Sequence, residues 1–157
     1  MSVMTEPTTT LSKDRLRLWL KLLKVQTTIE GALRRRLRDE FGTTLPRFDV
    51  MSALARHPEG LRMSDISGLL KVSNGNVTGI VDRLVEDGQA LRVAVPGDRR
   101  AQQVRLTPAG SRAFAEQARA HEAWLSDLIR ALDGSAIGAL SRQLDAVTHD
   151  LEDRDAL

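Results

Sequence analysis

Small hydrogen-bonding side chains gather on one segment of the chain, residues 73–84. An apolar stripe at helical spacing runs through it and predicts a buried helix face. The stripe residues are Val77, Ile80, Val81 and Leu84. The opposite side would present Ser73, Asn74, Gly75, Asn76, Thr78, Gly79 and Arg83. Amide and hydroxyl side chains bond bases and phosphates, and glycine permits close approach. The segment is therefore predicted to read double-stranded DNA, with a solvent-exposed helix face as the alternative.

A second group of candidate residues lies between two predicted strands. Residues 91–95 and 103–106 alternate apolar and polar side chains, and Pro96-Gly97-Asp98-Arg99 between them is typical of a turn. The turn would place Arg99 and Arg100 on an exposed tip, where an arginine can enter a narrow minor groove. The alternative for two adjacent arginines is a solvated loop.

A cluster of arginines lies near the end of the first predicted helix. Its members are Arg34, Arg35, Arg36 and Arg38. Guanidinium groups suit forked recognition of phosphate. Three interpretations stay open: a solvated face complemented by neighbouring carboxylates, contact with the DNA backbone, and a site for a phosphate-bearing effector. Trp19 could line the apolar part of such an effector site, or belong to the core.

Other reactive chemistry has little support in the sequence. The chain has no Cys, which excludes disulfides, thiolate metal sites and a cysteine redox switch. His57, His121 and His149 lack the spacing of metal ligands. His121 lies on a predicted apolar face and is interpreted as a packed histidine, with ligand or pH sensing as the alternative. No catalytic grouping is visible, so we expect neither an enzyme nor a cofactor.

Two short helices are expected to hold the polar segment. Ser64 is predicted to cap a helix that runs to about Leu70, and Ser73 to cap the next one, which ends at Asp87-Gly88. Together they form a helix-turn-helix. A helix over residues 11–41 and one from Pro46 to about residue 56 precede them.

Two further helices are expected after the hairpin. Thr107-Pro108 would start a long one that ends at Gly134-Ser135, and a last helix would follow. The helices at both ends of the chain carry more apolar surface than one small core needs, so they should meet each other or a partner chain.

These elements predict a mainly α fold with one β-hairpin. We expect a flexible tail at 1–10, a helical dimerisation region at 11–45 and 108–157, and a DNA-binding domain at 46–107. Residues 1–60 carry 11 basic and 7 acidic side chains, whereas 108–157 carry 5 and 9, so an anionic partner should avoid the C-terminal third. The first ten residues do not read as a secretory signal and no apolar run is long enough to span a membrane, so we expect a cytoplasmic protein without a membrane partner.

Residues 81–110 closely resemble the signature of the MarR family. The matching residues are Val81-Asp82-Arg83-Leu84, Asp98-Arg99-Arg100 and Val104-Arg105-Leu106-Thr107-Pro108-Ala109-Gly110. The resemblance covers nearly the whole chain. It implies a winged helix-turn-helix and a homodimer that binds a pseudo-palindromic operator. It also implies that Arg99 probes the minor groove, with Asp98 bracing the wing through a bond to a nearby arginine.

The sequence departs from the family pattern at Gln89-Ala90, where members usually carry a Leu-Val pair. We expect weaker packing at the start of the first hairpin strand, and its boundary is in doubt. The positions predicted to read DNA are unaffected.

The resemblance further implies a repressor that a small anionic effector releases from DNA. This sequence is similar to the subgroup that answers to hydroxycinnamoyl-coenzyme A thioesters. In that case the acyl group would fill an apolar pocket between the dimerisation region and the DNA lobe, and the phosphates would engage Arg34–Arg38. The alternatives are a regulator of a phenolic or drug-resistance operon that responds to free aromatic acids, and a helix-turn-helix that binds protein.

Overall fold

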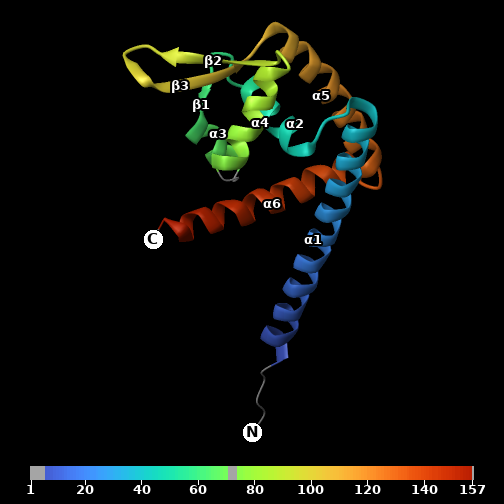
Figure 1. The fold of residues 1–157 in the computed structure, drawn as a ribbon. Helices are drawn as coiled ribbons and strands as arrows, with labels where there is room; N and C mark the ends of the chain where they lie inside the picture. The colour runs from blue at the N-terminus through green and yellow to red at the C-terminus, as the bar shows by residue number, and fades with distance from the viewer. Residues whose placement is uncertain (1–5, 71–73, 157) are drawn as a thin grey trace. The chain divides into compact units, whose positions relative to one another are not determined.

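The computed structural model describes residues 6–70 and 74–156. The chain folds as two compact units, Met1–Glu122 and Ala123–Leu157. The first unit contains the helices α1 (Glu6–Phe41), α2 (Leu45–Ala55), α3 (Met63–Leu70) and α4 (Asn74–Glu86), and the strands β1 (Leu61–Arg62), β2 (Ala90–Val95) and β3 (Asp98–Leu106). The helix α5 (Pro108–Leu128) runs into the second unit, which ends with α6 (Gly134–Asp155). The mainly α, winged helix-turn-helix prediction is confirmed (Figure 1).

The first two helices follow the predicted boundaries closely. α1 begins at Glu6 rather than Leu11, so residues 6–10 of the expected tail are helical. The chain leaves α1 through Gly42, whose φ of +61° lies in the left-handed region that favours glycine. Thr44 caps α2 by accepting a bond from the Arg47 N–H at 3.3 Å, with Pro46 in the first turn.

The helix-turn-helix has one boundary that differs from the prediction. α3 begins at Met63, so Ser64 lies in its first turn and does not cap it. The Asp65 carboxylate instead accepts the backbone N–H of Arg62 at 3.1 Å. The predicted cap of α4, Ser73, lies outside the described residues. α4 ends as predicted, with Gly88 at φ +71° just after it.

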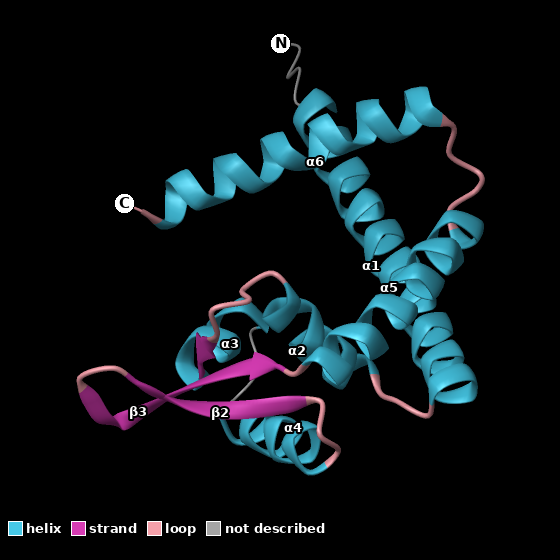
Figure 2. Ribbon diagram, turned by 90° about the horizontal axis from the view of Figure 1, so that it is seen from above, coloured by secondary structure: helices cyan, strands magenta, loops and turns pink. Residues whose placement is uncertain are grey.

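The hairpin belongs to an antiparallel sheet with strand order β1-β3-β2, and it extends away from the helices (Figure 2). β1 was not predicted from the sequence; its two residues pair with Val104 and Gln103 of β3. The turn is Pro96-Gly97, with Gly97 at φ +83°, and β3 already begins at Asp98. Asp98 and Arg99 therefore lie in the strand rather than in the turn.

One hydrophobic core joins the helix-turn-helix to the sheet. It contains Val50, Met51, Ala53 and Leu54 of α2, Leu61 of β1, Ile66 of α3, Val77, Val81 and Leu84 of α4, Ala90 of β2 and Val104 of β3. Ala90 is 3% exposed and begins β2. The small side chain after Gln89 therefore fits the core, and the doubt about the strand boundary is settled at Ala90.

The start of α5 holds the base of the hairpin. Thr107 caps the helix as predicted: its hydroxyl accepts the Gly110 N–H at 3.0 Å and donates to the Gly88 carbonyl at 2.7 Å. The Thr107 N–H also donates to the Gln89 carbonyl at 3.1 Å. A Cβ at Gly110 would lie 1.9 Å from that carbonyl oxygen, so the close approach requires glycine.

The end of α5 differs from the prediction. The helix stops at Leu128, and Gly134 begins α6 instead of ending α5. The cause is Asp133, whose carboxylate caps α6 by accepting the Ala136 N–H at 2.8 Å. α6 carries an exposed apolar row formed by Ile137, Leu140, Leu144, Val147 and Leu151.

Candidate nucleic-acid interface

The buried side of α4 anchors the helix in the core. Val77, Val81 and Leu84 are fully buried, which confirms three residues of the predicted stripe. Ile80, the fourth, is only partly buried, because it also lines two pockets. A recognition helix needs such an anchored side so that its other side can enter a groove of DNA.

The opposite side of α4 is exposed and polar. The exposed residues predicted to contact DNA are Asn76, Thr78, Gly79 and Arg83, and Asp82 and Glu86 are exposed on the same helix. Asn74 and Gly75 belong to the first turn of the helix, but the described side chains begin at Asn76. Ser64 is exposed on α3. A Cβ at Gly79 would meet no described atom within 4 Å, so the surface here is open to close approach.

The wing carries its charged residues at the start of β3. Asp98, Arg99 and Arg100 are all exposed. The Asp98 carboxylate accepts the backbone N–H of Arg100 at 3.1 Å. This local bond fixes the backbone next to the turn, whereas the resemblance implied a bond from Asp98 to an arginine side chain.

An ion pair that the sequence analysis missed ties the wing to α4. Arg92 of β2 bonds to Asp82 of α4. Arg92 pairs with the buried Val104 across the hairpin, and directly paired residues point to the same sheet face. Its side chain therefore lies on the face that packs on the helices. The sequence places Arg92 in a predicted strand, but it does not show which face of that strand turns toward the helices, so the pair with Asp82 could not be predicted.

A second arginine links α2 to the end of α4. The Arg47 guanidinium donates to Asp87 Oδ2 at 2.6 Å and to Gln89 Oε1 at 2.8 Å. Its side chain is only 20% exposed, so these bonds are partly shielded from water. Gln89, the departure from the family pattern, thus acts as a hydrogen-bond partner at the base of the wing.

Four other arginines of this lobe are different. Within the described part of the chain, no ion pair or hydrogen bond involves the side chains of Arg62, Arg83, Arg99 and Arg100. All four are exposed. Exposed guanidinium groups without carboxylate partners are available to an anionic surface such as DNA.

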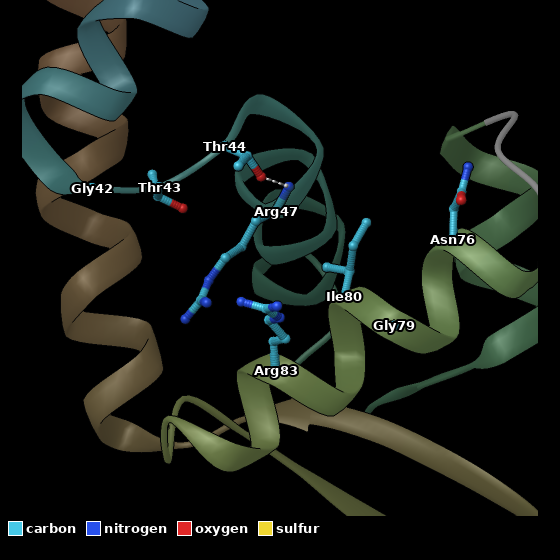
Figure 3. A pocket seen from close by; sticks show the side chains of 8 residues that line it. All are labelled: Gly42, Thr43, Thr44, Arg47, Asn76, Gly79, Ile80 and Arg83. Carbon is cyan, nitrogen blue, oxygen red and sulfur yellow. Dashed lines mark hydrogen bonds between the residues drawn. The ribbon is translucent and has the colours of Figure 1, made fainter.

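A pocket opens beside the exposed face of α4. It has a volume of about 450 Å³ and is lined by Gly42, Thr43, Thr44, Arg47, Asn76, Gly79, Ile80 and Arg83. Figure 3 shows Arg47 from α2 and Arg83 from α4 reaching toward the same space. Arg47 is already bonded to Asp87 and Gln89, so Arg83 is the guanidinium group of this pocket that is available to an anionic ligand.

The arginine cluster of α1 does not converge on one site. Arg34 lines a second pocket of about 220 Å³, together with Glu30, Leu45, Pro46, Asp49, Leu70 and Ile80. It is already bonded to Glu30 at 2.6 Å. Arg35, Arg36 and Arg38 are not among the lining residues, and Arg38 pairs with Asp39 at 3.4 Å. Trp19 is 57% exposed and lies about 22 Å from Arg34 along the helix.

Asp49 and His121 interact near this second pocket. Partial burial raises the pKa of Asp49, and the nearby His121 and Arg34 oppose that change. Partial burial lowers the pKa of His121, which Asp49 opposes. The imidazole stacks on Phe48 with ring centroids 4.6 Å apart. These contacts agree with the interpretation of His121 as a packed histidine.

Neither a metal site nor a membrane-spanning helix occurs among the described residues. There, no group of three or more His, Asp or Glu side chains is placed to hold a metal ion. In the same part of the chain, no helix has the length and apolar character needed to cross a membrane.

Comparisons with known proteins place this geometry in a family. Residues 41–101 match the family model described as MarR family. A crystal structure of a MarR family transcriptional regulator from Silicibacter pomeroyi is 36% identical, covers 89% of this chain and 96% of that chain, and has a TM-score of 0.75. The chain belongs to the MarR family.

Two other proteins similar to this MarR-family chain have lower sequence identity to it. The transcriptional activatory protein BadR from Rhodopseudomonas palustris is 31% identical over 112 residues, which cover 70% of this chain. The chain spans 59% of the length of BadR. Sco3205 from Streptomyces coelicolor, solved in complex with DNA, is 22% identical over 89% of this chain and 88% of that one, with a TM-score of 0.77, and shares the fold.

Proposed function

We propose that this MarR-family chain is a transcriptional regulator that binds a pseudo-palindromic DNA operator as a homodimer. The observation that carries the proposal is an exposed polar face on the anchored α4, in one lobe with a wing on which Arg99 and Arg100 are exposed and have no ion pair among the described residues. α4 would enter the major groove and Arg99 the adjacent minor groove, and Arg100 would also contact the DNA. The other contacts would come from Ser64, Ser73, Asn74, Gly75, Asn76, Thr78, Gly79 and Arg83.

The homodimer is proposed from the exposed apolar surface of the long helices. In α1, the exposed row includes Leu11, Leu18, Leu22 and Val25, and α6 carries the row described above. Monomeric proteins rarely leave contiguous apolar surface of this size in water. We therefore propose 11–45 and 108–157 as the dimerisation region. Two-fold symmetry would place the two α4 helices on half-sites about one helical turn apart.

A small anionic effector is proposed to release the protein from DNA. The pocket in Figure 3 supports this, because Asn76, Gly79 and Arg83 belong both to its lining and to the exposed face of α4. An anion bound at Arg83 in this pocket would compete with DNA for that side chain. The pocket has a volume of about 450 Å³, which suits a free aromatic acid. The volume therefore favours free aromatic acids as the class of effector.

The coenzyme A thioester is the second candidate effector. Its phosphates would engage Arg34, Arg35, Arg36 and Arg38. Arg34 lines the 220 Å³ pocket, which supports a role for this side chain in binding an effector. Arg35 and Arg38 are exposed on the same stretch of helix, where a long phosphate-bearing chain could reach them.

Calorimetry with aromatic acids and their coenzyme A thioesters separates these candidates. Arg36→Ala and Arg38→Ala should weaken thioester binding and leave free-acid binding and operator binding unchanged. Equal loss of operator binding would assign these arginines to the DNA backbone. If both variants bind the thioester and the operator as tightly as the wild-type protein, these arginines form a solvated helix face and the thioester proposal fails.

A further inference from the structure

One basic groove contains two of the proposed DNA-contacting residues, Ser64 and Arg100, together with Arg62, to which the proposed contacts give no role. It lies where β1 and the start of α3 meet the first part of β3, and it has a volume of about 370 Å³. The lining residues are Arg62, Met63, Ser64, Arg100, Ala101 and Gln102. No carboxylate side chain is among them.

Both arginines of this groove are available to a ligand. Arg62 and Arg100 are exposed, and their side chains make no ion pair or hydrogen bond within the described chain. Asp65, the nearest carboxylate in sequence, accepts the backbone N–H of Arg62. Two like charges beside one groove repel each other, and an anion between them removes that repulsion.

The two arginines reach the groove from neighbouring strands. Arg62 of β1 is paired with Gln103 of β3, and Arg100 lies three residues before Gln103 on the same strand. The pairing of β2 with β3 shifts between Ala94 and Val95, so β3 is irregular on the Arg100 side of Gln103 and the regular alternation of side chains between the two sheet faces is interrupted there. Arg62 and Arg100 both line the groove, where their side chains can meet one phosphate group.

We propose that Arg62 and Arg100 clamp one backbone phosphate of the operator. The proposal rests on the proposed function: a lobe with α4 in the major groove and the wing in the adjacent minor groove must pass over the phosphate strand between them. The groove lies between the helix-turn-helix and the wing, where that strand would run. Both guanidinium groups would donate to the non-bridging oxygens, and the Ser64 hydroxyl would add a third donor.

The first test compares Arg62→Ala with Arg112→Ala, which removes one exposed charge from α5, outside the groove. The probe is a duplex that the wild-type protein selects from a random pool. Arg62→Ala should weaken binding about tenfold, lower the slope of log Kd against log salt by about 1 per protomer, and preserve the preference for the selected duplex. Arg112→Ala should change neither quantity. Equal effects of the two variants would overturn the clamp.

The second test neutralises phosphates one at a time with methylphosphonate groups. At one position in each half-site, a methylphosphonate should weaken wild-type binding as much as Arg62→Ala does. The Arg62→Ala protein should lose no further affinity when that same phosphate is neutralised. Independent, additive losses at every position would overturn the clamp. If the wild-type protein prefers no duplex, the proposed function itself fails. Full binding by Arg62→Ala, with unchanged circular dichroism, removes the clamp alone.

Discussion

Arg92 and Arg99 lie on the same hairpin but have opposite surroundings. Arg92 forms an ion pair with Asp82 of α4, so a carboxylate of the same chain already balances its charge. Arg99 is exposed and has no such bond within the described chain. The family signature contains Asp82 and Arg99 alike. The structure separates a residue that positions the wing from one that is available to DNA.

Asp82→Asn tests the positioning role. We expect the change to lower stability by at most about 1 kcal/mol, because the pair is partly exposed to solvent. Hydrogen exchange in β2 should rise, and operator affinity should fall although Asp82 would not contact a base. Asp82→Glu, which keeps the charge, should restore part of both. Unchanged exchange and affinity in Asp82→Asn would show that the ion pair does not position the wing.

The lowered pKa of His121 predicts a dependence of stability on pH. Burial lowers the pKa of folded His121 below its ordinary value of 6.5. Between that lowered pKa and pH 6.5, the unfolded chain therefore binds more protons than the folded one. Stability is therefore full above pH 6.5 and falls as the pH drops through the lowered pKa. His121→Gln should flatten this part of the curve in denaturant titrations from pH 7.5 to 5. A variant curve that falls as steeply as wild type would contradict the assignment.

At the level of elements, the sequence predicted the parts that depend on local signals. Thr107-Pro108 and Gly88 set the ends of their helices because caps act within a few residues. β1 could not be predicted, since two residues become a strand only by pairing with Val104 and Gln103. The bond from Arg47 to Gln89 spans 42 positions and has no local signature.

Gly79 and Gly110 should respond in opposite ways to substitution by alanine. Gly110→Ala should destabilise the protein by about 2 kcal/mol, because its Cβ would overlap the Gln89 carbonyl. Gly79→Ala meets no described atom within 4 Å and should stabilise α4 by up to about 1 kcal/mol. It should nevertheless weaken operator binding. Thermal unfolding and DNA titration of both variants check these predictions. A Gly110→Ala protein as stable as wild type would refute the close approach of Gly110 to the Gln89 carbonyl.

For the whole molecule, the exposed apolar rows predict that DNA binding depends on dimerisation. Leu144→Glu places a charge in the row of α6. It should shift the mass measured by light scattering toward the monomer and weaken operator binding by more than tenfold. Gln143→Glu, an exposed neighbour outside the row, is the matched control. A wild-type monomer at micromolar concentration would contradict the proposed dimer.

The most direct test of DNA reading by α4 and the wing is a fluorescence titration of the selected duplex and an unrelated duplex at 50 to 200 mM salt. For the wild-type protein, we predict at least about a thousandfold preference for the selected duplex and affinity that falls steeply with salt. Asn76→Ala should reduce the preference, and Arg99→Ala should weaken binding about tenfold or more with unchanged folding. Equal binding of both duplexes, or full operator affinity in both variants, would contradict the account.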